Sequence, residues 1–353
     1  MPRFALISLG CSKNLVDSEL MASRLLAAGY EKTEPDQAEA LLINTCAFID
    51  PAKQEAIDTI IAASRAREAG EAPADQKLVV TGCLSQRYAK DLVKLLPEVD
   101  CFVGVDLIGE IDSIVKATLE GRAEKIYSTK VSTLLPDFSA SRFRLTPSHY
   151  AYVKIAEGCN HACAYCAIPR IRGRHRSRPQ ANVVREVQGL VAQGVKEINL
   201  IAQDTTYYGM DRWEQKATKT SGVDSGRGES LASLLRELND IPGDFWIRVL
   251  YTHPAHWSRE LIETMASCDK VVKYVDIPLQ HIADHILEAQ RRMTDGDYIR
   301  RLLRDMRAAM PTIGLRTTFI SGLPHETEED HAELRDFMRE FRLGRAGVVP
   351  ASA

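Results

Sequence analysis

The chain has 353 residues, of which 45% are hydrophobic and 26% charged, with a formal net charge of −3. This length suits two domains that each bury a core, and the nearly balanced charge does not mark a nucleic-acid binder. The chain has eight cysteines and no secretory signal peptide, and its first apolar run, residues 4–9, is too short to cross a membrane. We therefore expect a cytoplasmic protein whose thiols serve as metal ligands or catalysts.

The first third of the chain alternates short apolar runs with helical patterns. The predicted strands are 4–9, 41–44, 77–80 and 101–105. The predicted helices are 16–28, 51–68, 85–96 and 107–119. Because the strands are almost continuously apolar, the pattern predicts a parallel sheet covered by helices on both faces, which forms an α/β domain at 1–122.

Three cysteines follow predicted strands of this domain: Cys11, Cys46 and Cys83. The carboxyl ends of parallel strands meet at one edge of a sheet, so we expect these thiols to form a metal-binding trio. The alternative is that each is a small buried hydrophobe. We prefer that alternative for Cys101, which lies inside an apolar strand, and for Cys268, which has no cysteine near it in sequence.

The pattern becomes polar and irregular after the first domain, and this predicts a linker at 123–148. The alternation then resumes with predicted strands at 152–155, 197–201, 245–251, 271–277, 315–320 and 347–349. Repeated βα units of this kind predict a partial (β/α)6 barrel resembling a TIM barrel over 149–353, with its chemistry at the loops after the strands. Residues 211–230 lack an apolar period, so we expect a mobile insertion there.

The first of these loops carries a C-x3-C-x2-C run made of Cys159, Cys163 and Cys166. Three thiolates on one loop can hold three irons of a four-iron four-sulfur cluster and leave the fourth iron open to a chelating ligand. The alternative is a Cys3His zinc site completed by His161 or His175, although structural zinc usually draws its ligands from two separated pairs. The spacing favours iron-sulfur chemistry.

With Tyr165 directly before its last cysteine, this run resembles the radical S-adenosylmethionine (SAM) superfamily. Combined with the three earlier cysteines, it resembles the methylthiotransferases, and the SLGCSKNLVDSE segment resembles the RimO branch rather than the tRNA-modifying branch. The supporting motifs are residues 8–19, 157–161, 168–173 and 278–281. The chain departs from the family at His325, where a glycine is usual, and at its end, where the family's TRAM β-barrel is absent from the sequence.

The resemblance implies a chemistry for both trios. It implies that SAM chelates the open iron of the cluster on Cys159, Cys163 and Cys166, and that one-electron reduction yields a radical able to abstract hydrogen from an unactivated carbon. A second cluster on the earlier trio would deliver sulfur. The implied substrate is the β carbon of an aspartate in protein twelve of the small ribosomal subunit, with flavodoxin or ferredoxin as electron donor. A tRNA methylthiotransferase and a non-catalytic iron-sulfur protein are the alternatives.

Four further residues are candidates for cofactor contacts. Tyr165 would pack beside the cluster and the nucleoside, although an ordinary core aromatic is the alternative. Gln203 and Asp204 end the second barrel strand, where they either bind SAM or cap the next turn. Gln280, together with His281, ends the fourth strand with the same two interpretations; His253 after the third strand is a weaker candidate.

Five arginines alternate along residues 170–178, just past the cysteine run. They are placed to grip an acidic substrate, the SAM carboxylate or ribosomal RNA. The alternative is a solvated loop. No aromatic residue interleaves them, so we expect any nucleic-acid contact to be secondary.

Overall fold

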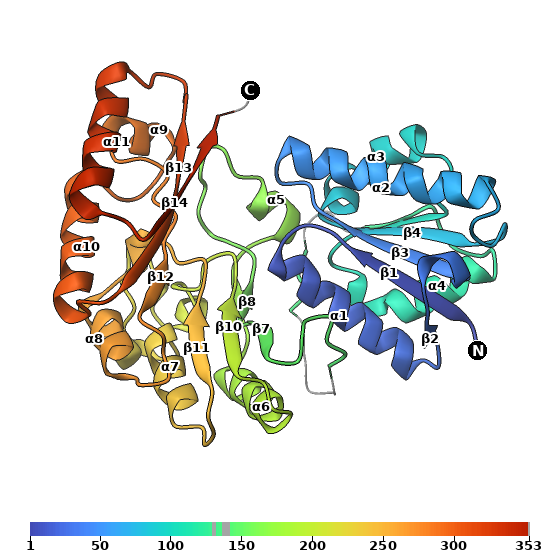
Figure 1. Ribbon diagram of the computed structural model, residues 1–353, viewed down its shortest axis with the longest axis horizontal. Coiled ribbons are helices and arrows are strands. Elements are labelled where there is room, and N and C mark those ends of the chain that lie inside the picture. Colours follow the sequence, from blue (N-terminus) through green and yellow to red (C-terminus); the bar gives the residue numbers. More distant parts are fainter. Residues whose placement is uncertain (129–131, 136–141, 352–353) are drawn as a thin grey trace. The chain divides into compact units, whose positions relative to one another are not determined.

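The computed structural model describes residues 1–128, 132–135 and 142–351. Contacts divide the chain into two compact units (Figure 1). Unit 1 comprises 1–146 and 167–174, and unit 2 comprises 147–166 and 175–353. The linker predicted at 123–148 falls partly on 129–131 and 136–141, which lie outside the described residues. The sequence had assigned 167–174 to the barrel domain, whereas its contacts are with unit 1.

Unit 1 is built on one parallel sheet with the strand order β2-β1-β3-β4-β5-β6. Its strands are β1 (Arg3–Ser8), β2 (Glu31–Lys32), β3 (Ala40–Thr45), β4 (Lys77–Gly82), β5 (Cys101–Val103) and β6 (Ile126–Tyr127). Every residue of β3 is buried, as expected for a central strand covered on both faces.

Helices cover both faces of this sheet: α1 (Ser12–Ala27), α2 (Asp50–Glu68), α3 (Cys83–Leu95), α4 (Ile111–Leu119) and the short α5 (Ile168–Arg172). Helices α2 and α3 pack on one face, where Leu41 and Ile43 point, and α1 and α4 pack on the other, where Ala40 and Leu42 point (Figure 1). The alternation along β3 therefore divides its apolar side chains between two cores. Cys101 is fully buried in the second of these cores, as predicted for a structural thiol.

Unit 2 contains two parallel three-stranded sheets, β7-β10-β11 and β12-β13-β14, and a small antiparallel pair, β8-β9. The strands are β7 (Tyr150–Lys154), β8 (Ala156–Glu157), β9 (Arg176–Ser177), β10 (Glu197–Ile201), β11 (Trp246–Val249), β12 (Tyr274–Asp276), β13 (Gly314–Ser321) and β14 (Arg345–Pro350). A bridge between Ile247 and Val271 connects the two sheets beside β11 and β12. The six parallel strands thus follow one another in chain order, which confirms the predicted partial barrel.

The helices of unit 2 connect these strands: α6 (Gln180–Ala192), α7 (Leu231–Asn239), α8 (Arg259–Ser267), α9 (Asp284–Ala289), α10 (Gly296–Ala309) and α11 (Glu328–Phe341). Side-chain caps define where several of them begin. Ser230 and Thr327 form capping boxes at α7 and α11, and Ser258 and Asp295 accept backbone N–H groups at α8 and α10. Within the described residues, no helix is long and apolar enough to cross a membrane.

The segment 211–230, predicted to be a mobile insertion, is instead tied to the barrel domain. Trp213 is buried and donates its indole N–H to the carbonyl of Glu229 at 2.9 Å. The backbone N–H of Val223 donates to the carbonyl of His256 at 3.0 Å. The polar composition misled the prediction because two buried apolar side chains anchor a segment that has no apolar period.

His325 stands where the family usually has glycine, and its backbone has a φ of 72°. A side chain with a Cβ is disfavoured in this left-handed region, typically by about 1–2 kcal/mol. Glycine, which has no Cβ, would adopt this backbone conformation without that cost.

We expect His325→Gly to raise the free energy of unfolding by about 1 kcal/mol or less, because the relief of strain exceeds the added entropy of the unfolded chain. Urea denaturation followed by circular dichroism measures this change. As a control, Arg335→Gly at an exposed position in the middle of α11 should destabilise the protein by about 1 kcal/mol. A loss of stability in His325→Gly would contradict the strain argument.

Candidate active site: two thiol trios

Three thiols of unit 1 lie at the carboxyl ends of neighbouring strands. Cys11 follows β1 and precedes α1, Cys46 follows β3, and Cys83 follows β4 as the first residue of α3. Because β1, β3 and β4 are adjacent in the sheet, the three cysteines share one edge, as predicted. The charges of Cys11 and Cys46 each act to raise the pKa of Cys83, as expected for thiols that share a sheet edge.

Two glycines allow this approach. A Cβ on Gly10 would lie 2.7 Å from the Cβ of Cys46, and a Cβ on Gly82 would lie 2.4 Å from Oδ1 of Asn44. Both glycines also have positive φ values, of 87° and 98°. The Gly-Cys pairs at residues 10–11 and 82–83 therefore bring backbone and thiols closer than any other residue would permit.

Two buried asparagines fix the loops beneath the trio. Nδ2 of Asn14 donates to the carbonyl of Thr45 at 2.8 Å, and Nδ2 of Asn44 donates to the carbonyl of Asn14 at 2.8 Å. Asn44 also donates to Oγ of Ser18 at 2.8 Å. These bonds tie the start of α1 to the end of β3, so the loops that carry Cys11 and Cys46 are held in register.

A buried arginine reaches the same trio. Arg172, at the end of α5 and 3% exposed, donates to Oδ2 of Asp17 at 2.8 Å and to Oδ1 of Asn14 at 2.6 Å. Its Nη2 also lies 3.4 Å from Sγ of Cys83. Sequence reasoning missed this role because Arg172 sits within a run of charges that resembles a solvated loop.

The surroundings of the three thiols shift their pKa values in different directions. Burial raises the pKa of Cys83 to about 11, although the charge of Arg172 opposes this rise. Burial also raises the pKa of Cys46. Burial acts in the same direction on Cys11, but the charges of Lys13 and Arg172 and two backbone N–H donors outweigh it, so the pKa of Cys11 is lowered. The exposed Cys11 is therefore the thiolate most ready to bind metal.

The second trio lies on the loop that follows β8 in unit 2. The backbone N–H of His161 donates to Sγ of Cys159 at 3.4 Å, and that of Cys166 donates to the carbonyl of Cys163 at 3.1 Å. Burial raises the pKa of Cys159, and the charges of Asp204 and of the other two thiols act in the same direction. Three thiols whose charges oppose one another in this way fit a cationic iron-sulfur cluster, which binds them as thiolates.

Arg292 is the arginine beside this trio, and no motif in the sequence indicates its role. Its Nη1 lies 3.8 Å from Sγ of Cys163 and 3.4 Å from the hydroxyl of Tyr165, while Nη2 donates to the carbonyl of Pro278 at 2.7 Å. The guanidinium thus contacts the loop at Tyr165 and places a positive charge near the thiols.

The residues predicted to contact a cofactor surround this loop. Gln203 hydrogen-bonds through its amide to Glu157 and accepts the backbone N–H of Gly158 at 2.8 Å, so it supports the start of the loop. Tyr165 remains 36% exposed. Gln280 ends its strand region with a φ of 74°, an unusual backbone conformation of the kind found at functional sites. Their contacts to a cofactor stay predictions.

Asp204 lies deeper than expected for a ligand contact. It is 2% exposed, and its Oδ2 lies 3.0 Å from Nε2 of His161. Its Oδ1 accepts the hydroxyl of Thr206 at 2.6 Å. The carboxylate is committed to the protein on both oxygens, and the predicted contact with SAM stays a prediction.

The arginine run divides between interior and surface. Arg172 and Arg178 are buried, and Arg178 pairs with Glu186 at 2.5 Å in unit 2. Arg170 and Arg174 are exposed. The buried arginines already form ion pairs with carboxylates of the protein. The predicted binding of an acidic substrate therefore concerns the exposed arginines.

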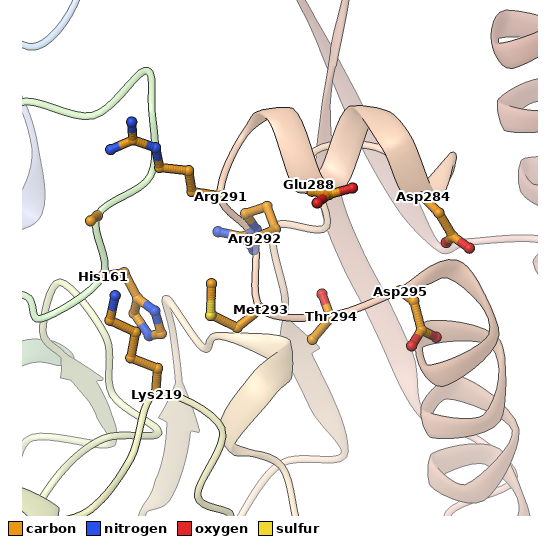
Figure 2. Close-up of a pocket in the computed structure, with 10 residues that line it drawn as sticks. His161, Lys219, Asp284, Glu288, Arg291, Arg292, Met293, Thr294 and Asp295 are labelled. Atoms are coloured by element: carbon orange, nitrogen blue, oxygen red, sulfur yellow. The ribbon is translucent and has the colours of Figure 1, made fainter.

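A pocket of about 500 Å³ opens beside the cysteine loop in unit 2. Figure 2 shows His161 and the basic side chains on one side of it and carboxylates on the other. The basic residues are Lys219, Arg291 and Arg292, and the acidic residues are Asp284, Glu288 and Asp295. Its size suits a small molecule or a few side chains.

Two families match the chain. Residues 3–104 match the Uncharacterized protein family UPF0004, and residues 153–338 match the Radical SAM superfamily. The ribosomal protein uS12 methylthiotransferase RimO of Akkermansia muciniphila is 59% identical over 98% of this chain and 77% of its own length. The RimO of Opitutus terrae is 52% identical over 99% of this chain and 75% of its own length.

Solved structures show the same fold. The radical SAM methyltransferase TsrM from Kitasatospora setae superposes with a TM-score of 0.67 at 16% identity, over 99% of this chain and 73% of that chain. The cobalamin-dependent radical enzyme OxsB gives a TM-score of 0.62 at 13% identity, over 96% of this chain and 52% of that chain.

Fold and thiol sites together define a radical SAM enzyme with an additional α/β domain ahead of its barrel, which uses SAM and four-iron four-sulfur clusters. Within that class, the chain belongs to the RimO family of ribosomal protein uS12 methylthiotransferases. The fold class predicted from the alternation of strands and helices and the family predicted from the cysteine runs and their neighbouring motifs are confirmed.

We expect the thiols of unit 1 to alkylate in the order of their pKa values. In cluster-free protein at pH 8, iodoacetamide should modify Cys11 first, because its pKa is lowered, and Cys83 last, because its pKa is about 11. Raising the pH toward 11 should accelerate the labelling of Cys83 more than that of Cys11, because more of Cys83 remains protonated at pH 8. Peptide mass spectrometry follows each site, with the buried Cys101, whose pKa is about 12, as the unreactive reference. Faster labelling of Cys83 than of Cys11 would refute this assignment.

Removing the guanidinium beside the first trio should weaken its hold on a cluster. We expect Arg172→Met to lose iron from this trio and to unfold more easily, by about 3 kcal/mol, because the buried ion pair with Asp17 would be broken. The double variant Arg172→Met with Asp17→Asn removes both charges of that pair and isolates the effect on iron content. Iron and sulfide analysis measures the loss, and Arg170→Met, at an exposed position of the same helix, is the matched control. Full iron content in the double variant would show that the guanidinium has no part in cluster binding.

Proposed function

We propose that this protein transfers a methylthio group to the β carbon of an aspartate in ribosomal protein uS12. Two relatives that it matches over 98% and 99% of its length are named as methylthiotransferases of ribosomal protein uS12. The observation that carries the proposal is the trio formed by Cys11, Cys46 and Cys83. A radical SAM enzyme that only cleaves SAM needs one cysteine trio, and this chain collects a second at the edge of a separate sheet.

We assign Cys159, Cys163 and Cys166 to the cluster that binds SAM, and Cys11, Cys46 and Cys83 to a second cluster that handles sulfur. When bound and reduced, the first cluster supplies the electron that cleaves SAM and so makes hydrogen abstraction from an unactivated carbon possible. The protein's residues position these groups. Gln203 holds Glu157 and Gly158 at the start of the loop, and Arg292 contacts Tyr165 at its end.

We assign the pocket beside the cysteine loop to the approach of the substrate. Lys219 and Arg291 place positive charge at its rim, where they complement a carboxylate such as the target aspartate (Figure 2). Charge pairing of this kind selects and orients a substrate without taking part in the hydrogen abstraction.

The partners follow from the chemistry. Reduction of a low-potential cluster needs a one-electron donor, for which we propose flavodoxin or ferredoxin. The exposed Arg170 and Arg174 are placed to meet ribosomal RNA near the target protein as a secondary contact. A ribosomal substrate places the reaction in the cytoplasm.

An in vitro assay separates the parts of this proposal. Reconstituted protein incubated with small ribosomal subunits, SAM, a sulfur source and a reductant should add the mass of one methylthio group to an aspartate of uS12. Cys163→Ala should abolish both 5′-deoxyadenosine release and modification. Cys83→Ala should retain 5′-deoxyadenosine release and lose modification, because only the second trio is broken.

Cys268→Ala, which alters a buried thiol outside both trios, is the control and should keep both activities. Tandem mass spectrometry of uS12 locates the added group. Modification of tRNA with unchanged uS12 would favour the tRNA-directed alternative, and release of no 5′-deoxyadenosine by the intact protein would favour the non-catalytic one.

A further inference from the structure

Two histidines and an aspartate meet in the interior of unit 2, next to the cysteine loop. His161 lies on that loop, Asp204 follows β10, and His256 ends the short 3₁₀ helix η5 (Pro254–His256) after β11. Their exposed fractions are 6%, 2% and 0%. Three segments distant in sequence thus bring three potential metal ligands together in a buried place.

The ligand atoms of these residues form a small triangle. Nε2 of His161 lies 2.9 Å from Nε2 of His256 and 3.0 Å from Oδ2 of Asp204, and Nε2 of His256 lies 3.5 Å from the same Oδ2. Ligand atoms about 2.1 Å from one tetrahedral zinc ion lie about 3.4 Å apart. The triangle therefore matches one face of such a coordination sphere with only small adjustments.

Hydrogen bonds to the other polar atoms of His256 and Asp204 fix the orientation of both side chains. Nδ1 of His256 lies 2.7 Å from the carbonyl of Ser221, so it is the protonated nitrogen and Nε2 presents its lone pair. Oδ1 of Asp204 accepts from the hydroxyl of Thr206 and from the backbone N–H of Tyr207, which leaves Oδ2 facing the histidines. A histidine fixed by a backbone carbonyl and a carboxylate fixed by donors are the usual outer partners of metal ligands.

The three atoms of the triangle have too few protons to satisfy one another by hydrogen bonding. With Nδ1 protonated, Nε2 of His256 can only accept, and Oδ2 of Asp204 also accepts. The single proton that Nε2 of His161 can carry is therefore shared between two acceptors. A divalent cation would satisfy all three lone pairs at once.

A third histidine covers this group without joining it. His253 stacks on His161 with ring centroids 3.7 Å apart, and its Nδ1 accepts the backbone N–H of Ala255 at 3.2 Å. Its proton therefore resides on Nε2, which cannot bind metal in that form. The stacked ring instead excludes water and limits rotation of His161.

We propose that Nε2 of His161, Nε2 of His256 and Oδ2 of Asp204 form a binding site for a divalent cation of the zinc class, separate from both cysteine trios. Two nitrogens and one carboxylate oxygen in a tetrahedral arrangement favour zinc over calcium or magnesium, which prefer oxygen ligands. An ion bound there would fix His161, and with it the backbone between Cys159 and Cys163.

Zinc analysis of the holoenzyme tests this site. Protein with both iron-sulfur clusters reconstituted anaerobically is given one equivalent of zinc and desalted, and its metals are counted by mass spectrometry. We expect one zinc per chain. X-ray absorption at the zinc edge should show nitrogen and oxygen neighbours at about 2.0–2.2 Å, with imidazole scattering and no sulfur at about 2.3 Å.

Variants locate the ion within the chain. Asp204→Asn and His256→Gln should each bind zinc at least about tenfold more weakly in competition with a chromophoric chelator, while iron and sulfide contents stay high. His281→Gln, which alters another fully buried histidine of unit 2, should bind zinc like the unaltered protein. The spectrum of the unaltered protein decides the question even if a variant fails to fold.

Three outcomes would overturn the proposal. A zinc content well below one per chain would leave the triangle a hydrogen-bonded network. Sulfur neighbours in the absorption spectrum would place the zinc in a cysteine trio instead. Unchanged zinc affinity in folded Asp204→Asn and His256→Gln would show that the ion binds elsewhere.

Discussion

Both cysteine sites depend on compensating the negative charge that three gathered cysteines acquire when they bind metal as thiolates. Thiolates brought together raise one another's pKa, and burial adds to the effect, as the pKa of about 11 for Cys83 shows. Each trio accordingly has an arginine within reach: Arg172 for the first and Arg292 for the second. A cationic cluster, bound as we propose, would complete this compensation, because each arginine offsets only part of the charge of three thiolates.

The two units gather their thiols in different ways. In unit 1, the parallel sheet brings together Cys11, Cys46 and Cys83 because neighbouring strands end at one edge, and Gly10 and Gly82 allow the close approach. In unit 2, one loop carries all three cysteines, and the barrel contributes the supports around it. A sheet edge positions residues that are distant in sequence, whereas a loop needs outside contacts to hold its shape. This difference explains why the supporting residues around the second trio come from several strand ends.

Apolar periodicity was enough to predict the strands, the partial barrel and the shared sheet edge of Cys11, Cys46 and Cys83, because those features depend on local pattern and on which strands are neighbours. The residues that hold the cysteine loops and the neighbouring segments in place could not be predicted from local sequence patterns. In the sequence, Arg172 belongs to a run of charged residues that is typical of a solvated loop. No neighbouring residue indicates that its guanidinium contacts Asp17 and Cys83. His256 lies 95 positions from His161 in sequence, so only the folded barrel brings their rings together. Polar composition likewise hid the anchors Trp213 and Val223.

The buried arginine of unit 1 also shows why its side-chain type matters. Nη1 of Arg172 serves Asp17, while Nη2 serves Asn14 and lies beside Cys83, so one planar group spans three partners. A lysine would carry the same charge on one nitrogen and could not reach all three from a single position. The charge of a lysine would still stabilise the thiolates, but the hydrogen bonds that connect α1 to the sheet edge with the cysteines would be lost. The guanidinium therefore contributes geometry as well as charge, and the motif that follows the radical SAM cysteines helps to build the first trio.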